Sequence, residues 1–257
     1  MQIPDKNCPK CPRLCSFRAE NRTRFPSYHN APVPSFGELS AQVLVVGLAP
    51  GLHGANQTGR PFTGDYAGFT LYESLQKSGF AEGSYLSTLP PPLRGRAGVG
   101  GEDSFARLTN TPPSNSLPQG EGGFYLKNCR ITNAVRCVPQ ENKPEPAEIK
   151  NCNEFLRAEI AAMPNLKAIL SLGLVSHNAV LKALGIKASA AKFAHGAKFV
   201  IPAKAGIHSR IDPRLRGGDI TIFNSYHCSR YNINTGRLNQ AMFDAVVEKI
   251  QKHVSLF

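Results

Sequence analysis

The sequence predicts an α/β fold in which helices cover both faces of a parallel sheet. Three observations predict it: short apolar runs typical of buried strands, segments with helical spacing between them, and turn-rich linkers at their ends. Strands that alternate with helices pair in parallel, because each helix returns the chain to the side where the next strand starts. The pattern leaves the order of the strands open.

The first predicted strand covers residues 41–48 and is followed by a loop at 47–65 with the sequence GLAPGLHGANQTGRPFTGD. Residues 66–78 then show helical spacing, and Gly79 is the predicted stop. A strand, a glycine-rich loop and a helix in this order place a ligand at the carboxyl end of the strand. Because the Walker and dinucleotide spacings are absent, a plain phosphate-binding turn or a simple connection remains open on glycine content alone.

The later elements continue the alternation. We expect strands at 129–133, 166–172, 198–201 and 220–224. We expect helices at 144–163, 175–184 and 236–254. The candidate core positions of the helix at 144–163 are Ile149, Phe155, Leu156 and Ile160. The closing helix has a stripe of apolar residues four apart, namely Leu238, Met242, Val246 and Ile250.

Two segments interrupt this pattern, residues 88–123 and 201–219. Both are rich in Pro and Gly, lack periodicity, and resemble translations of a repetitive DNA element inserted into a gene. We interpret them as low-complexity insertions on the surface of a single domain that spans residues 1–257.

The composition indicates a basic protein with a sizeable core. Of 257 residues, 41% are apolar, and the net charge of +12 suits a polyanionic partner because neutralised phosphates release counterions. An RNA-binding protein or a merely basic protein fits the same charge. No segment approaches 18 uninterrupted apolar residues, and the first residues lack the apolar core of a secretory signal. We therefore expect a cytoplasmic monomer that does not contact membranes.

Seven cysteines in such a chain favour a metal or cluster site over disulfides. Cys8 and Cys11 have two residues between them, which suits one metal site, whereas Cys137 and Cys152 are too widely spaced for a zinc ribbon. Four thiolates of this kind bind either zinc or an iron–sulfur cluster. The remaining three are interpreted as ordinary half-buried thiols: Cys15, Cys129 and Cys228. Among these, Cys15 is the competing candidate for a ligand.

The loop at 47–65 resembles motif A of the family 5 uracil-DNA glycosylases, GLAP-x-x-HG-x-N-x-TGR-x-FTGD, and matches it at every fixed position. Most other branches of that superfamily carry Asp, Asn or Glu just after the first strand. Leu48 and Ala49 are apolar there, which is the hallmark of family 5. The resemblance covers most of the chain outside the two insertions. It implies a three-layer α/β/α sandwich with a four-stranded parallel central sheet and an N-terminal cluster-binding segment.

Residues 225–238 resemble motif B of the same family, SYHPS-x-x-N-x-x-TGRL. They differ from it at one fixed position, where Cys228 replaces the usual proline. A proline would hold the preceding residue extended. We therefore expect the aim of His227 to be looser in this chain.

Cleavage of the bond between deoxyribose and uracil develops positive charge on the sugar and negative charge on the base. A catalyst needs a donor for the base, a polar group near the sugar, and a pocket for a flipped base. The resemblance assigns His227 to the base carbonyl, Asn133 to the edge of uracil, and Asp65 to the water or the sugar cation. The structural alternatives are a structural histidine, a turn residue and a helix N-cap, and the last is compatible with catalysis.

The resemblance also implies binding residues. Phe62 is the expected stacking platform for the base, with ordinary core packing as the alternative. Four other substrate-binding candidates come from motif A: Gly47, Ala49, His53 and Asn56. The DNA-binding candidates are Arg60, Arg230, Asn232 and Arg237. Residues 230–234 would wedge into the minor groove, unless they form only a basic solvated loop. The implied ligands of a structural [4Fe–4S] cluster are Cys8, Cys11, Cys137 and Cys152.

The sequence thus predicts an enzyme of base excision repair that removes uracil, and hypoxanthine or other deaminated bases, from duplex DNA. Two other classes remain open. One is a DNA-binding iron–sulfur protein of the same fold whose catalysis was weakened by the insertions and by Cys228. The other is a hydrolase that acts on free nucleosides.

Overall fold

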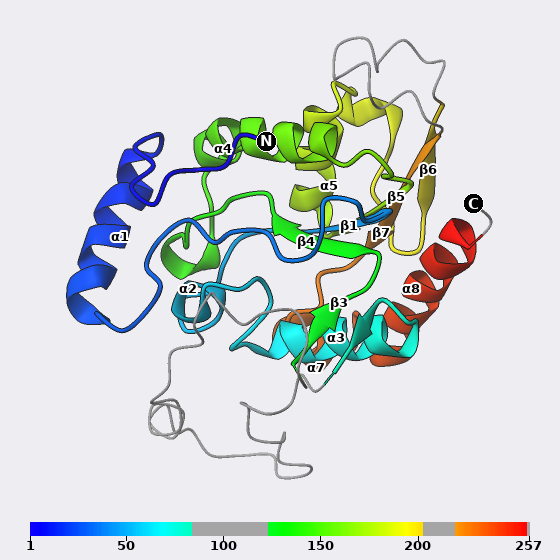
Figure 1. Cartoon of the computed structure of the whole chain (residues 1–257), viewed down its shortest axis with the longest axis horizontal. Helices are drawn as coiled ribbons and strands as arrows, with labels where there is room; N and C mark the ends of the chain where they lie inside the picture. The colour runs from blue at the N-terminus through cyan, green and yellow to red at the C-terminus, as the bar shows by residue number, and fades with distance from the viewer. Residues whose placement is uncertain (84–122, 203–218, 256–257) are drawn as a thin grey trace.

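The computed structural model describes residues 1–83, 123–202 and 219–255 (Figure 1). Nearly all of the two predicted insertions lies outside these described residues. Within them, no helix is long and apolar enough to cross a membrane.

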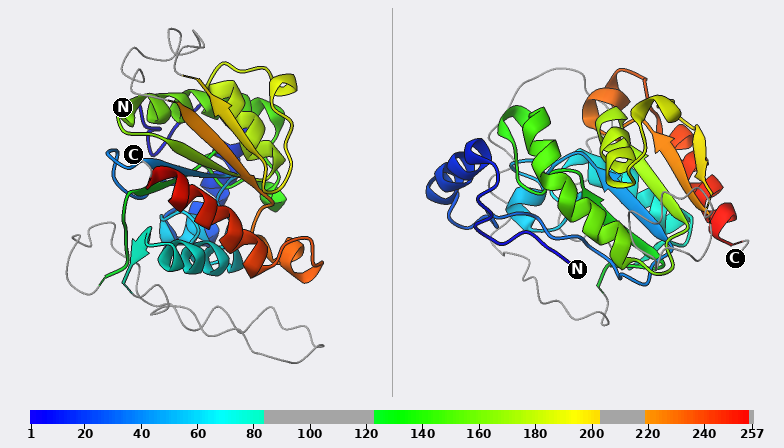
Figure 2. Two further views of the ribbon diagram at one scale, coloured as in Figure 1. Left: turned by 90° about the vertical axis from the view of Figure 1, so that its right-hand side faces the viewer. Right: turned by 90° about the horizontal axis from the view of Figure 1, so that it is seen from above.

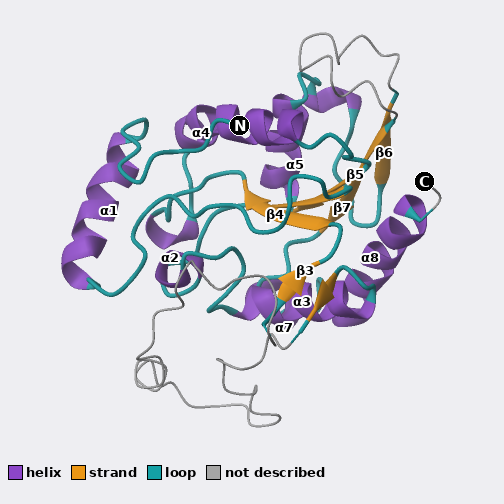
Figure 3. Cartoon of the chain, viewed as in Figure 1, coloured by secondary structure: helices purple, strands orange, loops and turns teal. Residues whose placement is uncertain are grey.

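A five-stranded sheet forms the centre of the molecule, in the order β4-β1-β5-β7-β6 (Figure 3). Its strands are β1 (Val43–Gly47), β4 (Cys129–Asn133), β5 (Ala168–Leu172), β6 (Lys198–Ile201) and β7 (Ile220–Ser225). The first four in the spatial order are parallel, and β6 pairs antiparallel with β7. The predicted parallel sheet is therefore confirmed. The resemblance implied four strands, and the structure has a fifth at one edge of the sheet. This strand is β6, which pairs antiparallel with β7, the next strand in the sequence.

Helices cover both faces of this sheet (Figures 1 and 2). One face carries α4 (Pro146–Ala162) and α5 (Leu174–Ala183), and the other carries α3 (Tyr66–Lys77) and α8 (Gln240–Val254). Successive residues of β1 alternate between the two layers: Val45 packs toward α3 and α8, and Leu44 toward α4 and α5. The three-layer sandwich is confirmed.

The core matches the predicted positions closely. Phe155, Leu156 and Ile160 of α4 are buried, and Ile149 is partly buried. In α8, Val246 and Ile250 are buried as expected. Each buried side chain of this size contributes roughly 1.5–3 kcal/mol relative to an exposed one.

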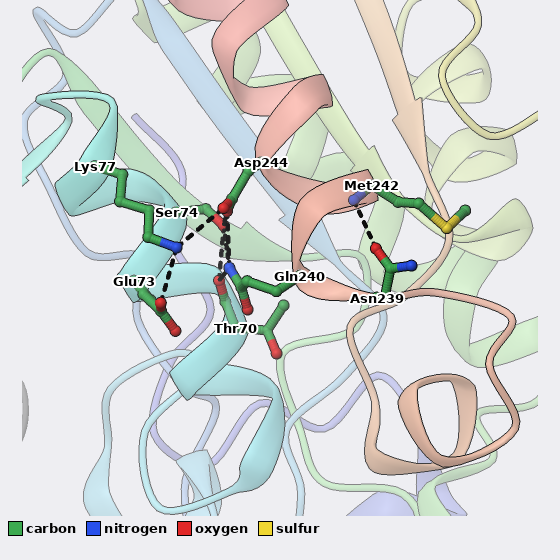
Figure 4. A network of polar contacts seen from close by, with 8 residues as sticks. All are labelled: Thr70, Glu73, Ser74, Lys77, Asn239, Gln240, Met242 and Asp244. Atoms are coloured by element: carbon green, nitrogen blue, oxygen red, sulfur yellow. Dashed lines mark hydrogen bonds and ion pairs between the residues drawn. The ribbon is translucent and has the colours of Figure 1, made fainter.

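The closing helix starts later than residue 236, where it was predicted to begin. Gly236 has a φ of +70°, which ends the short helix α7 (Arg230–Asn234), and the side chain of Asn239 then caps α8 by accepting from Met242 N at 2.8 Å (Figure 4). Figure 4 also shows the polar contacts that join α8 to α3. Lys77 lies 3.0 Å from the Asp244 carboxylate, and Gln240 donates to the same carboxylate at 2.8 Å.

The helix α1 (Pro12–Arg24) was not predicted. Its buried residues are Leu14, Arg18 and Asn21, so the buried face is mostly polar and gives no apolar periodicity. The remaining short elements were also not predicted: α2 (Ala55–Thr58), β2 (Ala81–Glu82), β3 (Tyr125–Leu126), and the 3-10 turns at Gln140–Asn142 and Ala188–Ala190. All of them are too short to show a period.

The described residues that flank each predicted insertion lie side by side. β2 and β3 pair antiparallel, and a Cβ on Gly83 would overlap the carbonyl oxygen of Gly123. At the second insertion, Ile201 pairs with Ile220. Ile201 itself ends β6 and is buried, so an insertion there can begin only after it.

Candidate active site

The predicted catalytic residues follow the carboxyl ends of three parallel strands, the neighbours β4 and β1 and, beyond β5, the strand β7. Gly47 ends β1 and is paired with Asn133, which ends β4. His227 follows the end of β7 by two residues. In an open parallel sheet, ligands bind at this edge because the loops that leave the strands surround it.

Phe62 and Asn133 meet above Gly47. A Cβ on Gly47 would lie 2.6 Å from the Phe62 ring and would overlap Asn133 Oδ1, so only glycine leaves room for both side chains. Asn133 is 4% exposed and Phe62 is 6% exposed. An aromatic face and an amide edge thus lie against the same strand end, which is the combination that a flipped base requires.

His227 completes this group. Its ring stacks on Phe62 with a centroid distance of 6.0 Å and an interplanar angle of 27°. Burial lowers the pKa of His227 to about 4, so its imidazole is neutral at neutral pH. A neutral imidazole can still donate one N–H to a developing negative charge.

Two contacts hold the loop around His227. Asn232 Nδ2 donates to the His227 carbonyl oxygen at 2.8 Å. The buried Cys228 thiol donates to Ala67 O at 3.4 Å and so connects the loop to the first turn of α3. These contacts act at the position where the motif B proline is missing.

Asp65 caps the helix that starts beside this loop. Its carboxylate accepts from Gly68 N at 3.2 Å, which confirms the N-cap interpretation. A Cβ on Gly54 would lie 2.8 Å from Asp65 Oδ2, so the glycine allows motif A to fold closely over the carboxylate. Burial raises the pKa of Asp65, and backbone N–H groups of Gly68 and Ala67 partly oppose that rise.

Phe62 has a φ of +56°, a left-handed conformation that is strained for an aromatic residue. The turn around it is held from both sides. Tyr72 OH donates to Pro61 O at 2.6 Å, and Thr63 Oγ1 donates to Arg60 O at 2.8 Å. These bonds offset the strain and fix the ring against Gly47.

Three other motif A residues lie away from this group. Asn56 is 1% exposed, and its amide donates to Asn30 Oδ1 at 2.9 Å. His53 is exposed and its Nδ1 is 3.0 Å from Tyr28 OH. Ala49 packs partly buried against the apolar group around Leu14. The far part of motif A therefore contacts the N-terminal segment. No motif or spacing in the sequence predicts a role for Tyr28 or Asn30, because their contacts with motif A join distant parts of the chain.

The contacts of the four DNA-binding candidates are known from the structure. Three arginines rest on aromatic rings: Arg60 on Phe36 at 4.6 Å, Arg230 on Tyr66 at 5.7 Å and Arg237 on Tyr226 at 4.5 Å. The fourth candidate, Asn232, uses its amide for the His227 carbonyl instead. The sequence analysis did not single out Tyr231, which is 72% exposed on α7.

The comparisons with known proteins agree with this geometry. A family model described as the uracil DNA glycosylase superfamily matches residues 34–251. The chain belongs to that superfamily. It is 35% identical to the type-5 uracil-DNA glycosylase of Thermus thermophilus, over 97% of this chain and 94% of that protein. It is 36% identical to the type-5 protein of Pyrobaculum aerophilum, over 90% and 82%, and 33% identical to that of Mycobacterium tuberculosis, over 95% and 77%. The family 5 resemblance is confirmed.

The glycosylase fold of this chain also contains a cavity lined by thiols. It lies between α1, α4 and the segment after β4, and its cysteines are Cys8, Cys11, Cys15, Cys137 and Cys152. The four predicted ligands, far apart in the sequence, thus line one cavity together with Cys15. Burial raises the pKa of Cys137 to about 12 and that of Cys152 to about 11, so these thiols need a cationic partner to become thiolates at neutral pH.

A single metal ion in this cavity would require ligand side chains that lie close together. In the part of the chain that the structure describes, no group of three or more His, Cys, Asp or Glu side chains is close enough together to hold a metal ion. A [4Fe–4S] cluster makes a different demand, because each thiolate binds a different iron atom and the ligands surround a cavity. The donor set of this cavity, sulfur with an apolar lining of Leu14, Val135 and Phe155, fits such a cluster.

Proposed function

We propose that this glycosylase hydrolyses the N-glycosidic bond of uracil in duplex DNA, the base for which its type-5 relatives are named. The observation that carries the proposal is the group of Phe62, Asn133 and His227 at the carboxyl end of β1, with Asp65 at the start of the next helix. An aromatic face, an amide, a neutral imidazole and a carboxylate are the four functions that the reaction needs.

The base-binding step rests on Phe62 and Asn133. The flipped base stacks on the Phe62 ring, which is held by the fixed turn around it. The Asn133 amide offers one acceptor and one donor to the edge of the base. Because an amide can rotate, the same residue serves the different edges of uracil and hypoxanthine. We therefore include hypoxanthine and other deaminated bases among the substrates.

The bond-breaking step rests on His227 and Asp65. As the bond to the base breaks, negative charge moves onto the base, and the neutral His227 donates a hydrogen bond to it. The Asp65 carboxylate stabilises the positive charge on the sugar and orients the water that adds to C1′. The water oxygen forms the new bond to C1′, and its proton balances the charge of the departing base. Both residues are held at fixed positions by loop and helix contacts.

The remaining candidates serve DNA binding. Arg60, Arg230 and Arg237 form a basic rim, and the net charge of +12 favours a polyanion over a free nucleoside. Gly47 lets Phe62 and Asn133, the two base-binding residues, lie against the end of β1, and His53 lies on the exposed part of motif A. We further propose that the protein is a single-domain monomer that acts in the cytoplasm.

We also propose that Cys8, Cys11, Cys137 and Cys152 hold a [4Fe–4S] cluster. The cluster supplies no step of the hydrolysis. It would join the N-terminal segment and α1 to α4 and to the segment after β4, the strand that ends at Asn133. Purified protein should contain about four iron and four sulfide ions per chain. A colourless chain that holds zinc after anaerobic purification would exclude the cluster.

The test is a glycosylase assay on duplexes that carry uracil or hypoxanthine, with alkaline cleavage at the abasic sites. We expect strand cleavage on both, with inhibition by undamaged duplex that weakens as salt rises. Binding without cleavage would favour the inactive DNA-binding protein. Cleavage of free deoxyuridine that undamaged duplex leaves unaffected would favour the nucleoside hydrolase.

A further inference from the structure

One buried arginine in the thiol-lined cavity has no carboxylate partner. Arg18 of α1 is 6% exposed and lines the cavity together with the five cysteines. Its Nη1 donates to Cys137 Sγ at 3.6 Å, and its Nη2 donates to Cys15 Sγ at 3.5 Å and to Cys8 O at 3.0 Å. The guanidinium therefore points at sulfur atoms.

This arrangement is costly without an anion. Among the described residues, no Asp or Glu lies within ion-pair distance of Arg18, whereas the buried Arg130 and Arg136 both contact Glu159. A buried charge needs a partner of opposite sign, because burial removes its hydration. Neutral thiols and one carbonyl oxygen do not supply that sign. The cavity therefore requires an anionic occupant.

We propose that Arg18 is the counter-charge of the iron–sulfur cluster and positions its ligand Cys137. The proposal rests on the cluster assigned above. A cluster bound by four thiolates is a net anion, and Arg18 places a positive charge at one of its sulfurs. Such contacts in the shell around a metal group stabilise it and raise its reduction potential.

Other donors continue the same pattern. Arg136 N donates to Cys152 Sγ at 3.4 Å, and Asn151 Nδ2 lies 3.8 Å from Cys11 Sγ. Three of the four proposed ligand sulfurs thus have an N–H donor. Cys15 differs, because its own Sγ donates to Cys8 O at 3.2 Å. This contact makes Cys15 a supporting residue of the site, and among the described residues Arg18 is the arginine whose side chain contacts its sulfur atoms.

The experiment compares Arg18→Met and Arg18→Lys with the wild-type chain after anaerobic purification. The control is Arg24→Met, an exposed arginine of the same helix. Iron content, visible absorption, release of iron to a chelator and the midpoint potential of the cluster are measured. Far-UV circular dichroism and thermal unfolding report whether each variant is folded.

We expect Arg18→Met to release iron about tenfold faster than wild type and to have a more negative midpoint potential. Arg18→Lys keeps the charge and should lie between the two, and Arg24→Met should match wild type. If a folded Arg18→Met chain keeps the wild-type release rate and potential, the inference is wrong while the cluster stands. If the wild-type chain holds no iron, both are wrong. Neither result bears on uracil excision, which is assayed separately.

Discussion

At the residue scale, Asp65 has a structural task as a helix cap, and the chemical task that we propose for it requires a charge that lowers stability. It caps α3, yet burial raises its pKa, so folding favours its protonated form. The stability gained from that proton is present at low pH and is lost as the pH rises through the raised pKa. Above the raised pKa the ionised carboxylate therefore lowers the stability of the fold, and a residue kept there at such a cost fits a catalytic role.

Asp65→Asn separates the two tasks, because Asn is an equally good N-cap without the charge. We expect the variant to be more stable than wild type at about pH 7 and equal to it near pH 3, where Asp65 is protonated. Its single-turnover rate on uracil should fall at every pH, and the loss of rate toward acid that we expect for the wild type should disappear. Thermal unfolding and excision rates over this range check both. A variant that is less stable but fully active would contradict the assignment.

His227 and Asn133 should differ in how substitutions affect different bases. His227→Ala removes one donor to the leaving base, which typically costs about a hundredfold in rate, with little change in DNA affinity. Asn133→Ala removes the amide edge, so its penalty should differ between uracil and hypoxanthine, whereas Asp65→Asn should slow both alike. The ratio of single-turnover rates on the two lesions measures this. Equal ratios for Asn133→Ala and Asp65→Asn would make Asn133 a structural residue only.

The motif resemblance located Phe62, Asn133 and His227, which the structure brings together. It gave no account of what Asn56 and Asn232 contact. Asn56 binds Asn30 and Asn232 binds the His227 carbonyl, and such contacts depend on the packing of distant segments. Spacing along the chain contains no information on them.

At the element scale, the N-terminal segment is docked on motif A by three successive residues. Tyr28 contacts His53, His29 N donates to Gln57 O at 3.1 Å, and the Asn30 side chain accepts from Asn56. The thiol-lined cavity lies at the start of the same α1 segment. The state of the cavity is thus connected to the loop that carries Asp65.

Asn30→Ala tests this connection. The Asn30 amide also donates to Phe25 O at 2.7 Å, and each lost bond costs about 1 kcal/mol. We expect faster hydrogen exchange at the amides of residues 54–59 and slower uracil excision, with the iron content unchanged. The exposed Thr23→Ala is the control. Unchanged hydrogen exchange at residues 54–59 would show that the Asn30 contacts do not stabilise this part of motif A.

A buried ion group ties β4 to α4. Glu159 is fully buried and contacts Arg130 at 2.7 Å and also Arg136. Burial by itself would raise the pKa of Glu159, but Arg136 and Arg130 outweigh burial and lower it. This contribution to stability is therefore present above the unfolded pKa of about 4.3 and is lost as the pH falls through the lowered value.

Glu159→Gln should lower the free energy of unfolding by about 3–5 kcal/mol at neutral pH, because it leaves two buried arginines without a carboxylate. The loss should shrink in acid, where Glu159 of the wild type becomes protonated. Urea unfolding at the two pH values measures it. Glu154→Gln breaks the exposed pair with Lys10 and should leave the free energy of unfolding nearly unchanged, because solvent screens that pair. Equal effects of the two variants would contradict the role of the buried group.

Element prediction succeeded where burial is apolar. The five strands of the central sheet and the helices α3, α4, α5 and α8 follow apolar runs or stripes, and their bounds lie within a few residues of the predicted ones. The helix α1 was not predicted because its buried face contains the polar residues Arg18 and Asn21. Arg18 lines the thiol-lined cavity. A helix that packs through polar residues has no apolar period to detect.

At the scale of the whole molecule, the described residues just before and just after each predicted insertion lie next to each other. Gly83 lies against Gly123, and Ile201 pairs with Ile220. Each insertion therefore leaves and re-enters the fold at one antiparallel pair, where a two-residue turn can close the chain.

Replacing residues 84–122, or residues 203–218, by Asn-Gly should keep the uracil excision rate and should not lower the melting temperature. A shorter connection costs less entropy to close, so a small rise in stability is expected. Activity and thermal unfolding of both deletion variants check this. A deletion variant that folds but loses excision would assign a functional role to the removed segment.

The proposal that Asp65 and His227 excise uracil is tested most directly by measuring free uracil. A duplex with one uracil is incubated with excess protein, and released base and abasic sites are quantified for the wild type and for a variant with both Asp65→Asn and His227→Ala. We expect one free uracil per abasic site with the wild type, and release reduced at least about a hundredfold with the variant, which still binds the duplex. Release at the wild-type rate by the folded double variant, or no release by the wild type, would contradict the account.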